Sequence, residues 1–133
     1  MKKAAEGMRK MGYSFDAVVS SPFVRAAQTA RIAADETGFK GSIRFSDALT
    51  PNAEYRDFRR LLTDLSKESP GTVLFVGHQP SMGNFISRLI SGREEASIDL
   101  KKGSVCCVEI KDIRPGVLAS LKWFFTSKQL EAR

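Results

Sequence analysis

The stretch Thr72-Val73-Leu74-Phe75-Val76-Gly77, TVLFVG, is the clearest strand signal in the chain. A strand that is apolar throughout, without alternation, is typical of a parallel sheet covered by helices on both faces. Pro70-Gly71 precedes the run, and a helix is expected after it over residues 81–90. TVLFVG therefore predicts a buried strand inside an α/β fold.

Similar patterns flank this strand on both sides. Helices are expected over residues 2–11, 21–36 and 54–65, and strands over residues 16–20 and 42–46. Ser21-Pro22 and Thr50-Pro51 both resemble helix starts, with a capping residue followed by proline. Two strands are expected over residues 104–111 and 117–125, joined by a turn, and residues 126–133 are expected to be a polar tail.

The order of these elements predicts the fold class. Helices alternating with strands, followed by two consecutive strands, favour a three-layer α/β/α sandwich with a mostly parallel sheet and an antiparallel edge. We expect a single domain over residues 1–125. The chain opens on a helix, without the strand that would normally come before it.

Composition limits the partners and the compartment. The 133 residues carry 21 basic and 15 acidic side chains, a net charge of +6 that favours anionic ligands. No aromatic residues interleave with a basic ribbon, and no apolar run is long enough to span a membrane, so neither nucleic acid nor membrane is expected as a partner. The adjacent Cys106 and Cys107 are poorly placed for a mutual disulfide, and we expect a cytoplasmic protein.

Two loops are candidates for chemistry. Ser20-Ser21-Pro22 and Gly77-His78-Gln79-Pro80 each follow a predicted strand and lead into a helix, where ligands of open α/β sheets bind. Arg25 lies one helical turn beyond the first loop and could reach the same crevice. His78 is the single histidine, and it is a structural residue on one hypothesis and a functional one on the other. Arg25 could equally be a surface cation paired with an acidic neighbour.

Other chemistries lack their sequence markers. One histidine and two adjacent cysteines form no recognisable metal-ligand set, and no glycine-rich phosphate loop or dinucleotide fingerprint is present. The chain also contains no GxSxG nucleophile elbow. We expect neither a cofactor nor a metal.

Two segments carry a family resemblance. SSPFVRAAQTA at residues 20–30 and VLFVGHQPSM at residues 73–82 resemble the histidine phosphatase, or phosphoglycerate mutase-like, superfamily, and within it the SixA-type phosphohistidine phosphatases. The resemblance implies that Arg25 and His78 are catalytic residues that contact the phosphoryl group, and we expect Ser21 to bind the phosphate with them. DALTPNAEYRDF at residues 47–58 resembles the same branch, whose compact site suits a phosphorylated protein side chain.

The family mechanism uses a histidine nucleophile that attacks phosphorus, forms a phosphohistidine intermediate and is freed by water. In the family this histidine belongs to an Arg-His-Gly or Arg-His-Ala motif at the end of the first, central strand, and neither motif occurs in these 133 residues. We therefore expect a truncated domain with weak or no activity as it stands. Asp47, Glu54 and Asp57 are weak candidates for the general acid.

Two functional hypotheses follow from the resemblance. In the first, the protein is a phosphatase for a phosphorylated protein, with phosphohistidine as the favoured group, or for a small phosphate ester. In the second, it is an inactive phosphate-binding or interaction domain. A missing central strand would expose unpaired backbone, so a homodimer that completes the sheet is a further expectation. A misassigned start of the chain is the alternative to a true truncation.

Overall fold

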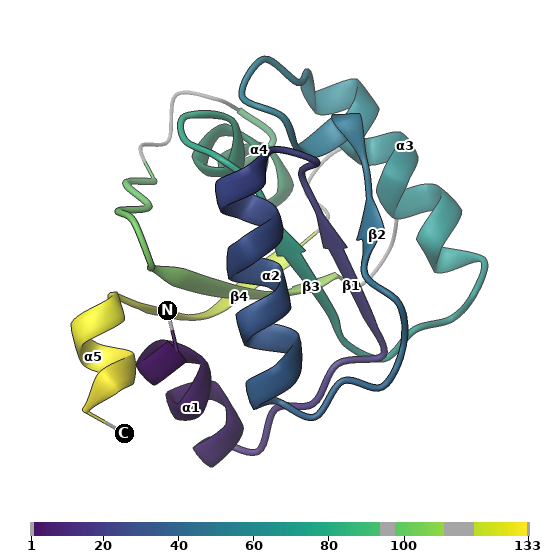
Figure 1. Ribbon diagram of the computed structural model, residues 1–133. Helices are drawn as coiled ribbons and strands as arrows, with labels where there is room; N and C mark the ends of the chain where they lie inside the picture. Colours follow the sequence, from purple (N-terminus) through teal and green to yellow (C-terminus); the bar gives the residue numbers. More distant parts are fainter. Residues whose placement is uncertain (1, 94–97, 111–118, 133) are drawn as a thin grey trace.

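The computed structural model describes residues 2–93, 98–110 and 119–132 (Figure 1). The predicted turn over residues 112–116 lies outside them. The helices are α1 (Lys2–Lys10), α2 (Val24–Glu36), the 3-10 helix η1 (Asp47–Leu49), α3 (Tyr55–Ser66), α4 (Ser81–Ser91) and α5 (Ser127–Glu131). The strands are β1 (Ala17–Ser20), β2 (Arg44–Phe45), β3 (Val73–Val76), β4 (Val105–Ile110) and β5 (Ala119–Phe125).

The strands form two sheets. A parallel sheet has the order β2-β1-β3, with Ala17 opposite Val73 and Ser20 opposite Val76. An antiparallel pair joins β4 to β5, with Val105 opposite Phe125. The predicted mixed α/β class, with a parallel sheet and antiparallel strands, is confirmed. Within the described residues, however, the antiparallel strands are a separate sheet and not the edge of the parallel one.

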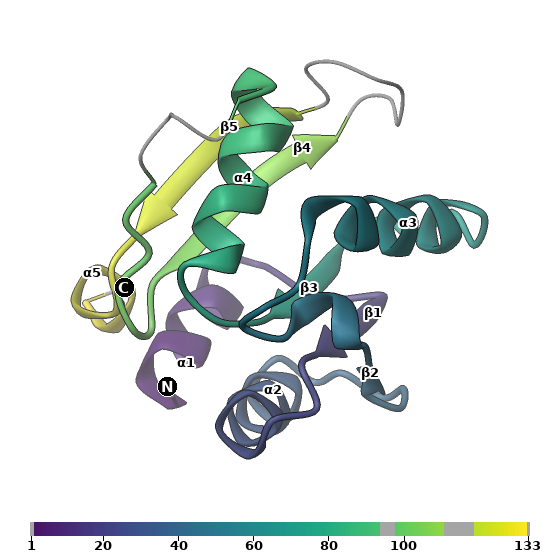
Figure 2. The ribbon, with the colours of Figure 1, turned by 90° about the horizontal axis from the view of Figure 1, so that it is seen from above.

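Helices cover both faces of the parallel sheet. Figure 2 shows α1 and α2 on one side of it and α3 and α4 on the other, with α4 also beside the β4–β5 pair. The two sides have different cores. Small residues dominate under α1 and α2, and large ones under α3 and α4: Ala4, Ala5, Met8, Ala30, Ala33 and Ala34 on the first side, and Phe58, Leu62, Leu65, Phe85 and Leu89 on the second.

Both predicted helix starts differ from the structure. Helix α2 begins at Val24 with Phe23 as its N-cap, and the Ser21 side chain does not cap it. Helix α3 begins at Tyr55 with Glu54 as its N-cap, whereas Thr50 ends the short helix η1. In both cases the hydroxyl has a different partner: Ser21 contacts a side chain from another loop, and Thr50 donates to the Asp47 carbonyl.

Strand β3 is less buried than its sequence predicts. All four of its residues, Val73–Val76, are only half-buried, although they are apolar throughout. The reason is its position, because β3 pairs with β1 on one edge and borders an open cavity on the other. Helices cover both faces of the sheet as expected, but the prediction of a fully buried strand is wrong because of this open edge.

The expected polar tail contains helix α5, which packs against α1 (Figure 1). Thr126 and Gln129 form a capping box at its start, and Leu130 is fully buried between Ala4, Ala5 and Met8. Gly7 allows the close approach, because a Cβ atom there would fall on the Leu130 carbonyl oxygen. The tail therefore belongs to the core, through one apolar residue that the polar composition conceals.

Candidate functional site

The two candidate loops meet at the end of the parallel sheet where β1 and β3 terminate. Strands β1 and β3 run in the same direction, so the residues that follow them lie side by side. The Ser21 amide donates to the Val76 carbonyl at 2.9 Å, which fixes the separation of the two loops. The Ser21 Oγ atom then lies 2.8 Å from His78 Nε2, within hydrogen-bond distance.

Ser21 is held firmly in this position. Its side chain is fully buried, and its hydroxyl oxygen also accepts a hydrogen bond from the Phe23 amide at 3.2 Å. The Phe23 ring lies 5.2 Å from the His78 ring, between centroids, and is tilted by 59° to it. The imidazole is therefore contacted by a hydroxyl at one nitrogen and by a tilted aromatic ring beside it.

Burial lowers the pKa of His78 below its ordinary value, because the charged form loses hydration. The ring is consequently neutral at neutral pH, and one ring nitrogen is a donor while the other is an acceptor. Such a group can donate a hydrogen bond to a phosphoryl oxygen. It can also gain a proton when a negative charge is bound beside it.

The lowered pKa of His78 predicts a pH effect on stability. The unfolded chain binds a proton more readily at this residue, so the contribution of neutral His78 is complete above about pH 6.5 and is lost as the pH falls through the folded pKa. We expect the unfolding midpoint in urea to fall more between about pH 7.5 and 5.5 in the wild type than in His78→Asn. Equal falls in both proteins would contradict this.

Arg25 lies in the first turn of α2 and is exposed. Together with His78 it lines an open cavity of about 1570 Å³. The cavity is larger than the 300–1,000 Å³ that is usual for a small-molecule pocket. Its walls include β3 and β4 along their lengths, so we call it the β3–β4 groove.

The groove has unpaired strand edges on both sides. Within residues 2–93, 98–110 and 119–132, β3 pairs only with β1 and β4 pairs only with β5. The Thr72 and Val76 carbonyls accept hydrogen bonds from the β1 side, so alternation directs the backbone groups of Val73 and Phe75 into the groove. The two walls between these strand edges come from helices. Small residues of α2 line one wall, namely Ala26, Thr29 and Ala33. Large residues of α3 and α4 line the other wall, namely Phe58, Leu62, Leu65, Met82, Ile86 and Leu89.

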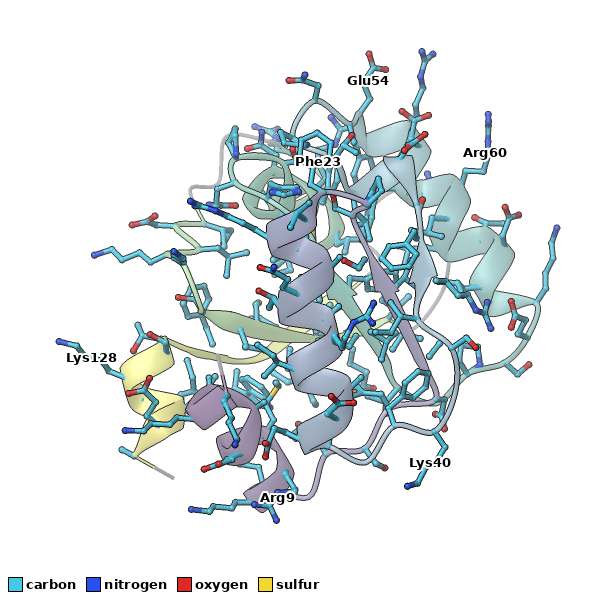
Figure 3. All side chains as sticks on the ribbon, in the orientation of Figure 1. Arg9, Phe23, Lys40, Glu54, Arg60 and Lys128 are labelled. Carbon is cyan, nitrogen blue, oxygen red and sulfur yellow. The ribbon has the colours of Figure 1, made fainter. Side chains whose placement is uncertain are left out.

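The three candidate general acids are not brought together with His78. Asp47, Glu54 and Asp57 are all exposed, and none of them lines the cavity that holds Arg25 and His78. Glu54 pairs with Arg56 at 3.0 Å instead. In Figure 3, Glu54 and Phe23 lie at the same end of the molecule, with Glu54 pointing outward. The acid role of these residues remains a prediction.

Sequence reasoning missed two features beside this site. The first is the contact between the Phe23 and His78 rings. Phe23 was predicted to lie in the first turn of a helix, and its apolar character alone did not indicate this contact. The second is a pocket of about 550 Å³ between the starts of α3 and α4, lined by Arg56, Arg59 and Arg88. The close spacing of Arg56 and Arg59 was its only signal, because Arg88 comes from a different helix.

None of the helices in the described part of the chain has the length and apolar character needed to cross a membrane. Both cysteines are free thiols, as expected from their adjacency. Burial, with the neighbouring Cys107 as the second cause, raises the pKa of Cys106 to about 11, so this thiol is protonated and unreactive at neutral pH.

The first part of the chain matches a known family model. Residues 1–51 match the model of the Histidine phosphatase superfamily (branch 1). An uncharacterized protein of Picosynechococcus sp. is 29% identical over 105 residues, which cover 78% of this chain and 62% of that protein. The chain therefore spans less than two thirds of the length of this curated relative.

The fold has close matches among solved structures. The protein histidine phosphatase SixA, complexed with tungstate, superposes with a TM-score of 0.85 and 22% identity over 97% of this chain and 80% of that one. A SixA structure from Agrobacterium tumefaciens superposes with a TM-score of 0.73 and 17% identity, over 94% of this chain and 76% of that one. The alpha-ribazole phosphatase from Shigella flexneri superposes with a TM-score of 0.68 and 17% identity, over 95% of this chain and 82% of that one. The predicted resemblance to this superfamily and its fold is thereby confirmed.

Proposed function

We propose that this chain forms the phosphoryl-binding part of a phosphatase, and that its substrate is a phosphorylated protein side chain, with phosphohistidine as the favoured group. The observation that carries the proposal is the 2.8 Å contact between Ser21 Oγ and His78 Nε2, in a cavity that Arg25 also lines. These groups combine a cation with an oriented imidazole, which suits a phosphoryl group. The tungstate in the similar SixA structure is an oxyanion of related geometry.

Each residue has a distinct part in the proposed step. The Arg25 guanidinium makes a bidentate contact with two phosphoryl oxygens, and the first amides of α2 add positive potential. His78 donates a hydrogen bond to a third oxygen, while Ser21 and Phe23 hold the ring in place. As the nucleophile bonds to phosphorus and the bond to the leaving group breaks, these contacts stabilise the charge that spreads over the oxygens.

The nucleophile requires a second element in this proposal. His78 is the single histidine of the 133 residues and occupies the phosphate-contacting position. The β3–β4 groove offers a place for a strand that carries the Arg-His-Gly or Arg-His-Ala motif of the family. A strand parallel to β3 would place its carboxyl end beside His78, because β3 itself ends there. We propose that such a strand completes the sheet. A second copy of these 133 residues could pair with the open strand edges in a homodimer, but it contains neither motif and would not supply the nucleophile.

The alternative function is an inactive phosphate-binding domain. It is supported by the contact of Ser21 with His78 and by the cavity that Arg25 and His78 line, because in this proposal the three residues hold an oxyanion without any further group. Both functions require oxyanion binding, but only the phosphatase would hydrolyse the bound substrate. A phosphohistidine peptide hydrolysed by the complete protein would decide for the enzyme.

Titration calorimetry with tungstate and with inorganic phosphate tests the shared step. We expect Arg25→Ala and His78→Ala to weaken binding by about tenfold or more, because each removes a hydrogen bond to a charged group. Arg31→Ala, an exposed arginine two turns along the same helix, is the matched control and should bind like the wild type. Equal losses in Arg25→Ala and Arg31→Ala would refute a specific site.

A further inference from the structure

A second basic pocket lies next to the proposed phosphate site. It has a volume of about 550 Å³ and is lined by the loop before α3, by the first part of α3, and by α4 from its start to Arg88 in its last turn. Three arginines and one glutamate are its charged residues: Arg56, Arg59, Arg88 and Glu54. Positive charge is therefore in excess, and we call this feature the arginine pocket.

Two of the arginines, Arg59 and Arg88, act on Tyr55. The Arg88 guanidinium carbon lies 4.7 Å from the centre of the Tyr55 ring, in a cation–π contact. Arg59 and Arg88 both act electrostatically on the Tyr55 hydroxyl, although burial dominates and raises the pKa of this phenol. The hydroxyl is thus protonated and can donate a hydrogen bond, in company with the two guanidinium groups.

The walls of the pocket are tied to the phosphate site. Pro80 and Ser81 line it, and they follow His78 by two and three residues. The Ser81 hydroxyl donates to the Pro51 carbonyl at 2.6 Å, which joins the start of α4 to the loop before α3. A polypeptide that placed a phosphorylated residue against His78 would therefore run close to the arginine pocket.

The pocket already holds one carboxylate of its own. Glu54 Oε2 lies 3.0 Å from Arg56 Nε, and both side chains are more than half exposed, at 64% and 81%. An incoming carboxylate could therefore replace Glu54 on Arg56 without opening a buried contact. Base stacking is less suitable for this site, because Arg88 already covers one face of the Tyr55 ring and Phe85 packs 6.2 Å from it.

We propose that the arginine pocket binds aspartate or glutamate side chains of an acidic segment that flanks the phosphorylated residue of the protein substrate. The inference rests on the proposed function and adds a docking subsite to it. Arginine forks match carboxylates in a bidentate manner, and the surplus charge attracts an acidic partner at long range. The subsite gives specificity for acidic phosphoproteins over small phosphate esters.

The test measures binding of a short glutamate-rich peptide, and of its glutamine counterpart, to the full chain. We expect the glutamate peptide to bind more tightly, and Arg59→Glu to weaken it about tenfold. Arg60→Glu makes the same charge change one residue along α3, where the side chain points away from the molecule (Figure 3), and should weaken binding less than about twofold. Glu54→Gln should strengthen binding, since it removes the internal competitor.

Several outcomes would overturn the docking site. Equal losses in Arg59→Glu and Arg60→Glu would mean general surface attraction, and a tighter complex with a single-stranded oligonucleotide of matched charge would point to nucleic acid. Inorganic phosphate provides the separate readout. If phosphate binding does not depend on Arg25 and His78, the proposed function fails while the peptide result stands. If only the peptide result fails, the phosphatase proposal stands without this subsite.

Discussion

Replacing Gly7 with alanine is expected to lower the free energy of unfolding by about 2 kcal/mol. Helix propensity alone predicts the opposite, a gain of about 1 kcal/mol, because glycine is unfavourable inside a helix. In the fold, however, the added methyl group would fall on the Leu130 carbonyl, which is backbone of α5 and cannot rotate away. Overpacking of this kind costs about 3 kcal/mol and outweighs the propensity gain.

Urea unfolding followed by circular dichroism measures this change. Lys3→Ala is the matched control, because it lies on the exposed face of the same helix and should change stability by less than about 0.5 kcal/mol. A chain that ends at residue 126 lacks α5, and there Gly7→Ala should no longer destabilise. A stabilising effect of Gly7→Ala in the full chain would refute the packing of α5 on α1.

Adding a synthetic strand is expected to produce phosphatase activity. The peptide would contain about five apolar residues followed by Arg-His-Gly, a length that matches typical strands. Turnover of an aryl phosphate or a phosphohistidine peptide should rise at least about a thousandfold over that of the chain alone, because loss of a nucleophile has effects of this order. The physical reason is that the groove offers apolar walls and two strand edges that are unpaired within the described part of the chain.

Two control peptides separate binding from catalysis. A peptide ending in Arg-Ala-Gly should bind the groove and give no turnover, and a peptide with a proline in the strand should not bind. His78→Ala should remove most of the turnover without changing the affinity for the strand. If the Arg-His-Gly peptide binds and nothing is hydrolysed, the inactive phosphate-binding alternative is favoured.

The sequence predicts the elements of this fold better than their ends. The apolar runs of β1 and β3 and the apolar faces of α1, α3 and α4 arise from local pattern, and each lies close to its predicted position. Ser21 illustrates the limit. A serine before a proline is a good capping signal, yet its hydroxyl contacts His78, 57 residues away, which no local pattern encodes.

Burial was harder to predict than secondary structure. The composition of β3 indicates a strand enclosed on all sides, but composition does not say whether a neighbour is present to enclose it. Leu130 shows the reverse case, because one leucine among polar residues gave no sign that it would be fully buried against α1. In both cases the deciding contact is with a segment distant in the chain.

The candidate site was predictable in part. The sequence placed Ser21 and His78 in two candidate loops and Arg25 one turn beyond the first, and in the fold Ser21 contacts His78 while Arg25 and His78 line one cavity. The arginine pocket was not predictable, since Arg88 reaches Tyr55 only through the packing of α4 against α3. The binding experiments described above test the functional roles of His78, Arg25 and the arginine pocket.

Trp123 provides an optical reporter for this molecule. It is the single tryptophan of the chain, it lines the β3–β4 groove, and its indole nitrogen donates to the Tyr13 hydroxyl at 2.7 Å. Across the strand pair it lies opposite Cys107, whose sulfur is 3.8 Å from the same hydroxyl. A strand that enters the groove removes water from the indole, so its emission should shift to shorter wavelength without any added dye.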